Sequence, residues 1–171
     1  MTARRPLAGL AAELARLDAE ELPFLTQVDV RADPAMVASL GLQLEPNTSV
    51  SPDGHDILWL GPDEWLYVAE PGSTLTPAAL EAVLREGDGH FSVVDVSANR
   101  AVFEMHGPDR HERLATACPL DLHPRSWGPG DCAQTVFGSA PILLHERPDA
   151  TRVFVRPSFA GYVVALLDTP V

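Results

Sequence analysis

Short stretches of alternating apolar and polar residues run along this chain, separated by stretches with helical spacing. Gln27 to Arg31 places valine at every second position, which is typical of a strand with one buried face. Asp33-Pro34 then predicts a helix N-cap followed by the first helical residue, and this short helix should end near Gly41. Ahead of the strand, residues 7–17 repeat leucine every three or four positions, which predicts one amphipathic helix.

The middle of the chain predicts a hairpin. Two apolar runs, 57–60 and 65–69, flank the Gly/Pro/Asp turn at 61–64, and the turn-rich segment 45–56 precedes them. Such a short turn between two strand-like runs favours antiparallel pairing of its neighbours. We therefore expect two adjacent strands here.

A helix should follow the hairpin. Thr76 is a good N-cap, Pro77 suits the first helical position, and Gly87 should stop the helix. Glu81 and Arg85 are four residues apart and can form an ion pair on the helix surface. The expected apolar stripe consists of Leu80, Val83 and Leu84.

The second half of the chain repeats this order of elements. We predict strands at 101–105, 133–137, 142–145 and 151–155, and helices at 108–117 and 157–167. The last helix should turn Phe159, Val163, Leu166 and Leu167 inward. Two local parallels support a duplication: Asp33-Pro34 corresponds to Pro108-Asp109, and Ile57–Leu60 corresponds to Ile142–His145.

These elements indicate an α+β fold made of two ferredoxin-like α/β units packed around a shared core. We expect an N-terminal helical extension at residues 1–22, a first unit at 23–92 and a second unit at 93–171.

Charge and composition exclude several classes of function. The net charge of −12 and the sequence pI of about 4.7 disfavour nucleic acids and anionic membranes as partners. The twelve basic residues are all arginine. Phosphate-binding P-loops, pyridoxal phosphate enzymes and protein kinases all need a lysine, so these classes are excluded.

The cysteines and the N-terminus predict a cytoplasmic protein. Residues 1–17 carry charges throughout, so they make a poor signal peptide and no membrane span. Cys118 and Cys132 lie close enough in sequence for a disulfide, but without signs of export we expect two reduced thiols.

No catalytic or metal-binding motif stands out. The glycines form no dinucleotide-binding fingerprint, and the six histidines show no ligand spacing, so we expect no metal and no cofactor in this chain. Cys118 has no suitable base beside it and is best interpreted as a packing residue. Asp63 and Glu64 are adjacent on a turn, where solvated charges are more common than a paired-carboxylate active site. We therefore expect no catalytic residue.

Two groups of residues leave alternatives open. Trp59, Trp65 and Trp127 either fill the core, which we favour, or anchor a partner. Asp95 and Arg100 flank a turn, and fastening that turn by an ion pair is favoured over clamping a substrate.

Several short segments together resemble the gamma subunit of heterotetrameric sarcosine oxidase, nearly end to end. Leu60-Gly61-Pro62-Asp63-Glu64-Trp65-Leu66 is the most specific of them. The others are Leu22–Gln27, Glu45–Thr48, Leu58–Trp59, Val94–Ser97, Pro119–Leu122, Cys132–Thr135 and Ser158–Tyr162. More distantly, Val94–Ser97 and His106–Asp109 are similar to the folate-dependent aminomethyltransferase of the glycine cleavage system, whose N-terminal fold would suit two paired α+β units.

The resemblance implies an accessory subunit of a complex of alpha, beta, gamma and delta chains. That complex oxidatively demethylates sarcosine to glycine, with hydrogen peroxide and either formaldehyde or methylene-tetrahydrofolate as further products. The resemblance places FAD, FMN, NAD and tetrahydrofolate in the partner subunits and implies that this chain stabilises the oxidase by binding the alpha subunit.

We expect the subunit contact at the hairpin around residues 62–65, at the turn of residues 95–100 and at the start of the last helix. The candidate interface residues are Pro62, Asp63, Glu64, Trp65, Asp95, Arg100, Phe159 and Tyr162. Two alternatives are a small stand-alone folate-binding or one-carbon transfer protein and a scaffold unrelated to oxidation.

Overall fold

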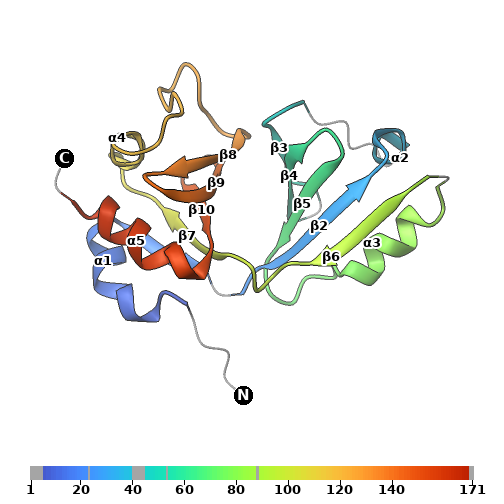
Figure 1. Ribbon diagram of the computed structural model, residues 1–171, viewed down its shortest axis with the longest axis horizontal. Helices are drawn as coiled ribbons and strands as arrows, with labels where there is room; N and C mark the ends of the chain where they lie inside the picture. The colour runs from blue at the N-terminus through green and yellow to red at the C-terminus, as the bar shows by residue number, and fades with distance from the viewer. Residues whose placement is uncertain (1–5, 23, 40–44, 53, 88, 170–171) are drawn as a thin grey trace. The chain divides into compact units, whose positions relative to one another are not determined.

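The computed structural model describes residues 6–22, 24–39, 45–52, 54–87 and 89–169, and the chain divides into two compact units (Figure 1). The central unit consists of residues 24–98. The split unit combines residues 1–23 with residues 99–171. None of the described helices is long and apolar enough to cross a bilayer.

The central unit is a five-stranded antiparallel sheet with two helices. Its elements are β2 (Thr26–Ala32), α2 (Pro34–Ser39), β3 (Ser49–Val50), β4 (His55–Gly61), β5 (Glu64–Ala69), α3 (Pro77–Leu84) and β6 (Phe91–Asp95). The strands lie in the order β3-β4-β5-β2-β6. One buried cluster forms its core: Val28, Val30, Ala32, Met36, Val37, Ile57, Trp65, Tyr67 and Leu84.

The split unit has a second five-stranded antiparallel sheet. Its elements are η1 (Ala8–Leu10), α1 (Ala11–Arg16), β1 (Ala19–Leu22), β7 (Ala101–Met105), α4 (Arg110–Ala115), β8 (Cys132–Phe137), β9 (Ala140–Glu146), β10 (Thr151–Val155) and α5 (Pro157–Leu167). The strands lie in the order β1-β7-β10-β9-β8. Its core is built around fully buried Phe103, Phe137 and Met105, with leucines from α1 and α4.

The two sheets have the same topology. Read from its other edge, the central sheet has the order β6-β2-β5-β4-β3. Each strand then corresponds in turn to one strand of the order β1-β7-β10-β9-β8 in the split unit. This is the ferredoxin-like strand order, so the predicted α+β class with two ferredoxin-like units is confirmed. The predicted parallel between Ile57–Leu60 and Ile142–His145 is also confirmed, because the first lies in β4 and the second in the equivalent β9. The prediction of one core shared by the two units stays a prediction.

If the sequence is divided into two halves before β6, the edge strands β1 and β6 are exchanged between the halves. Strand β1 directly precedes β2 in the chain but pairs with β7, where Glu20 faces Glu104. Strand β6 directly precedes β7 but pairs with β2, where Val93 faces Val30. Each half of the chain therefore donates its first strand to the sheet of the other half.

This exchange corrects the expected domain boundaries. Residues 1–22 are not a separate helical extension, because they contain β1 and belong to the split unit. The expected boundary between residues 92 and 93 falls inside β6, and the structure divides the chain after residues 23 and 98. Neither edge strand has a local turn that would reveal its partner, so the pattern of the sequence left both outside the predicted strands.

The N-terminal helix is fastened to the end of the last helix. Leu14 and Leu17 are buried as the leucine spacing predicts, and Arg16 Nη2 lies 2.6 Å from Asp168 Oδ2. In α5, Val163 and Leu167 are buried as expected. Phe159 and Leu166 are partly buried against the same core.

The remaining helices show where local signals are reliable. The helix after β2 starts at Pro34 as predicted and runs to Ser39, and its expected stop at Gly41 lies outside the described residues. Helix α4 is shorter than the predicted 108–117. The predicted apolar stripe of α3 is wrong for Val83, whose side chain is 45% exposed. In this two-turn helix, Leu84 is buried in the core of the central unit and Leu80 packs against that core.

We expect Thr76→Ala to lower the free energy of unfolding by about 1 kcal/mol, because the Thr76 hydroxyl accepts a hydrogen bond from the Ala79 amide at 3.1 Å. Thr76→Ser keeps this acceptor, so its free energy of unfolding should stay within a few tenths of a kcal/mol of the wild-type value. Urea unfolding followed by circular dichroism measures both. Equal losses in the two variants would show that the hydroxyl does not cap α3.

Candidate functional site

The predicted interface residues of the hairpin divide into accessible and buried side chains. Pro62 and Asp63 are exposed at the tip between β4 and β5, and Glu64 is half-buried. Glu64 Oε2 accepts a hydrogen bond from Arg31 Nη2 at 2.6 Å. Trp65 is only 4% exposed and belongs to the core of the central unit, so its side chain does not form part of an accessible surface.

The turn after β6 is fastened by a side chain. Asp95 Oδ1 accepts a hydrogen bond from the Ser97 amide at 2.9 Å. A hydrogen bond from the Ser97 side chain and, second to it, the one from the Ser97 amide lower the pKa of Asp95. Asp95 is exposed, whereas Arg100 is half-buried and belongs to the split unit. The expected ion pair between them stays a prediction.

In the split unit, Tyr162 is the accessible member of the predicted interface. Its side chain is 44% exposed, and its hydroxyl accepts a hydrogen bond from the Ser139 amide at 3.2 Å. Gly138 has a φ of 58°, in the left-handed region, and a Cβ there would collide with the Tyr162 hydroxyl, so glycine is favoured at this position. Phe159 is half-buried against the core.

The tryptophans mostly fill the cores, as favoured from the sequence. Trp65 and Trp127 are buried, and Trp59 is half-buried opposite Trp65 in the hairpin register. Cys118 and Cys132 are buried free thiols. Cys118 Sγ lies 3.8 Å from Thr135 Oγ1, consistent with its interpretation as a packing residue.

A buried carboxylate organises the split unit, and the sequence analysis missed it. Glu146, at the end of β9, is 2% exposed. Its Oε1 accepts a hydrogen bond from Arg110 Nη2 at 3.0 Å and lies 3.0 Å from His111 Nε2. Its Oε2 accepts from Trp127 Nε1 at 2.9 Å and from Thr151 Oγ1 at 2.6 Å. We call these five residues the Glu146 network.

The Glu146 network has a structural role rather than a catalytic one. Burial alone would raise the pKa of Glu146, but hydrogen bonds from Thr151, Trp127, His111 and Arg110 lower it below the ordinary value. Both oxygens are occupied by donors of this chain, which come from α4, the loop before β8, and β10. The carboxylate therefore holds three segments against β9 and stays ionised.

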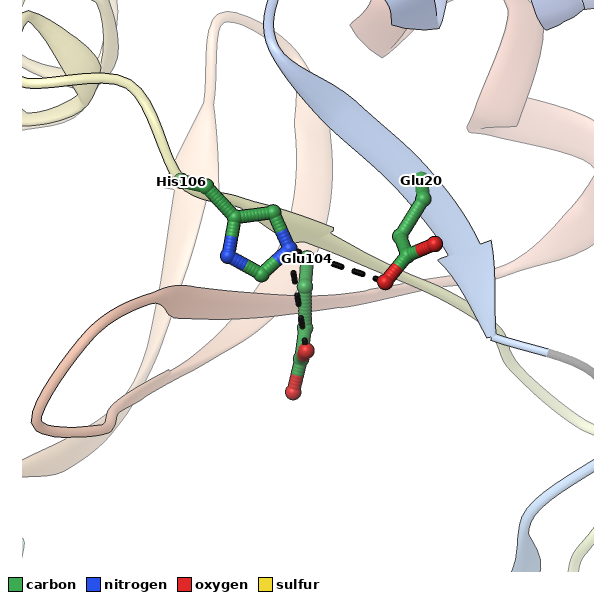
Figure 2. A group of neighbouring side chains, drawn as sticks. All are labelled: Glu20, Glu104 and His106. Carbon is green, nitrogen blue, oxygen red and sulfur yellow. Dashed lines mark ion pairs between the residues drawn. The ribbon is translucent and has the colours of Figure 1, made fainter.

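Three side chains of metal-binding type meet at the edge of the split unit's sheet (Figure 2). Glu20 comes from β1, Glu104 from β7, and His106 follows β7. His106 Nε2 lies 3.7 Å from Glu20 Oε1 and 4.0 Å from Glu104 Oε2. The pairing of β1 with β7 sets this geometry, because Glu20 and Glu104 are direct cross-strand partners.

Two arginines already neutralise the central carboxylate of this group. Glu104 Oε1 accepts a hydrogen bond from Arg152 Nε at 2.9 Å, and Arg147 Nε lies 3.8 Å away. Positive charge beside a carboxylate weakens its attraction for a metal cation. The group is therefore better suited to joining β1 to β7 and β10 through ion pairs than to holding a metal.

Two surface grooves lie in different units. A groove of about 500 Å³ in the central unit is lined by Arg31, Ala32, Asp33, Pro34, Asp63, His90, Phe91 and Ser92. A groove of about 380 Å³ in the split unit is lined by residues of η1, α1 and β1. The first includes Asp63 of the predicted interface.

The family model described as "Sarcosine oxidase, gamma subunit family" matches residues 28–170. The chain belongs to this family. The resemblance inferred from the short segments is thereby confirmed.

Relatives of the family are similar over most of the chain. Sarcosine oxidase subunit gamma of Corynebacterium sp. (strain P-1) is 38% identical over 154 residues, covering 84% of this chain and 74% of the relative. Sarcosine oxidase subunit gamma of Arthrobacter sp. is 41% identical over 133 residues, covering 72% of this chain and 64% of the relative.

Two solved structures share the fold. A chain of the heterotetrameric sarcosine oxidase from Corynebacterium sp. U-96, in complex with pyrrole 2-carboxylate, has a TM-score of 0.80 and 32% identity, covering 98% of this chain and 94% of that chain. The glycine cleavage system aminomethyltransferase T from Bartonella henselae has a TM-score of 0.63 and 15% identity, covering 95% and 49%. The second match confirms the distant fold similarity and nothing further.

We expect Glu146→Gln to lower the free energy of unfolding by about 2–4 kcal/mol, because Arg110 would lose a buried anionic partner. Glu112→Gln, an exposed change on helix α4, which carries Arg110, should have little effect. Urea unfolding of both variants measures the difference. A loss below about 0.5 kcal/mol in Glu146→Gln would contradict the role of the network.

The contribution of Glu146 to the free energy of unfolding should also depend on pH. Because the folded-state pKa of Glu146 is lowered, its stabilisation is fully present above the unfolded value of about 4.3 and decreases as the pH falls through the folded value. The stability difference between wild type and Glu146→Gln should therefore be constant above about pH 5 and shrink in more acidic solution. A difference that grows with acid would contradict this sign.

We expect zinc at about 100 µM to raise the melting temperature by less than about 2 °C, because Arg152 and Arg147 compensate Glu104. Differential scanning fluorimetry of wild type and His106→Ala provides the measurement. A shift above about 5 °C in wild type that His106→Ala abolishes would instead establish a metal site.

Proposed function

We propose that this chain is the gamma subunit of a heterotetrameric sarcosine oxidase and assembles with the alpha, beta and delta subunits of its own organism. The observation that carries the proposal is the structural match to a chain of such an oxidase, which covers nearly the whole of both chains. Family membership over residues 28–170 supports the same conclusion. The oxidase demethylates sarcosine to glycine and forms hydrogen peroxide, with the one-carbon unit leaving as formaldehyde or methylene-tetrahydrofolate.

The chain contributes stability to this assembly, and it contacts the alpha subunit most directly. Its contact surface includes the exposed hairpin residues Pro62 and Asp63, the exposed Asp95 and the exposed Tyr162. The half-buried Glu64, Arg100 and Phe159 complete this proposed surface. Trp65 contributes by packing beneath the hairpin rather than by touching the partner.

The reactive groups of the oxidase belong to other subunits. FAD, FMN, NAD and tetrahydrofolate are bound by the partners, and this chain takes no part in the chemical steps. The Glu146 network supports this assignment, because both of its carboxylate oxygens are taken by donors of the same chain.

A stand-alone folate-dependent transferase is not favoured. The aminomethyltransferase is 15% identical to this chain, and the match covers about half of that enzyme. The match therefore shows a shared fold, and the other half of the enzyme has no counterpart in it. The oxidase match is closer in identity and covers nearly all of the matched chain.

Co-expression of the alpha, beta and delta subunits with and without this chain tests the proposal. Without it we expect a several-fold lower yield of assembled complex and a matching loss of sarcosine-dependent hydrogen peroxide formation, because a bound subunit stabilises its partners by mass action. Size-exclusion chromatography and a peroxidase-coupled assay measure the two quantities.

Chemical cross-linking of the full complex tests the preferred partner. We expect most intersubunit cross-links of this chain to reach the alpha subunit. Full assembly and activity without this chain would contradict the accessory role, and cross-links mainly to beta or delta would contradict the alpha contact.

A further inference from the structure

The negative charge of the chain is concentrated in the central unit. Each unit carries twelve of the 24 acidic residues, but the central unit has only two of the twelve arginines, Arg31 and Arg85. Its formal net charge is therefore −10, against −2 for the split unit. Both arginines are already ion-paired within the unit. The central unit should therefore attract positively charged surfaces and repel acidic ones.

The groove of the central unit lies at the end of the sheet where β2 stops and β6 starts. Backbone hydrogen bonds fix its walls: the Ala32 amide donates to the Asp63 carbonyl, and the Asp33 amide donates to the His90 carbonyl, each at 3.1 Å. Figure 1 shows that α2 follows β2 at this end. The groove is therefore built from strand ends rather than from a loop alone.

Carboxylates outnumber positive charges around the groove. Arg31 Nη2 lies 2.6 Å from Glu64 Oε2, and Arg31 Nη1 lies 3.9 Å from Asp63 Oδ2, while the exposed Asp33 lines the groove beside them. Burial raises the pKa of Glu64, and the neighbouring Asp29 raises it further against the opposing effect of Arg31. This environment would be stabilised by one more cation.

Ala32, Pro34 and the half-buried Phe91 form the apolar part of the lining, which the exposed His90 and Ser92 complete. This apolar part suits the stem of a long side chain. An arginine packs its methylene groups on such surfaces, places its guanidinium over an aromatic face and forms paired hydrogen bonds with carboxylates.

We infer that this groove receives an arginine side chain from a partner subunit, with Asp33 and Asp63 as its carboxylate partners. The inference rests on the proposed function, since it names the chemistry of one contact within that assembly. It adds a specific pocket to the hairpin contact and predicts an exposed arginine on the facing surface of the partner.

The test compares two double variants of the full chain. Asp33→Asn with Asp63→Asn removes two groove charges and preserves the N-cap of α2, because asparagine can accept the hydrogen bond that Asp33 Oδ1 receives from the Ala35 amide. Glu45→Gln with Glu86→Gln removes two exposed charges of the same unit outside the groove lining. Circular dichroism and urea unfolding establish that both variants are folded.

Biolayer interferometry measures binding to the purified assembly of the alpha, beta and delta subunits at low and high sodium chloride. We expect the groove variant to bind about ten-fold more weakly at low salt and to lose part of the salt dependence, while the control stays within about three-fold of wild type. Equal losses in both variants, or no loss in the groove variant, would overturn the groove assignment. Failure of wild type to bind the assembly would instead overturn the proposed function.

Discussion

Antiparallel pairing of β1 with β7 is the constraint on which the split unit depends. It brings residues from the beginning of the chain onto a sheet whose other strands come from the second half. The same pairing sets Glu20 opposite Glu104 and places His106 beside both. The Arg16–Asp168 ion pair adds a second attachment between the first and last helices. Residues 7–22 are thus an integral part of the fold.

The two units use charge differently. In the split unit, the Glu146 network and the Glu104–Arg152 pair bury charges that neutralise one another, so these groups specify internal geometry. In the central unit, most of the charge faces outward with few arginines to balance it. Internal pairing suits a unit that holds its own segments together, whereas an unbalanced surface suits association with another chain.

Sequence reasoning succeeded where the signal is local and failed where it is distant. The β4–β5 hairpin and helix α3 were predicted because Gly61–Glu64 and Thr76-Pro77 specify their geometry within a few residues. The exchange of β1 and β6 was missed, because a strand of four or five residues does not encode which distant strand it pairs with. The Glu146 network was missed because the sequence shows a charge but not its burial. One usable signal existed, since Glu146 continues the apolar run of β9 without a turn before it.

The exchanged strands also impose an order on biosynthesis. Glu20 leaves the ribosome 84 residues before its cross-strand partner Glu104, whereas every strand of the central sheet is complete once Asp95 has been made. At about 5–20 residues per second, β1 would wait roughly 4–17 seconds for β7. The central unit can therefore fold first on the nascent chain, whereas β1 has no native partner strand until β7 emerges.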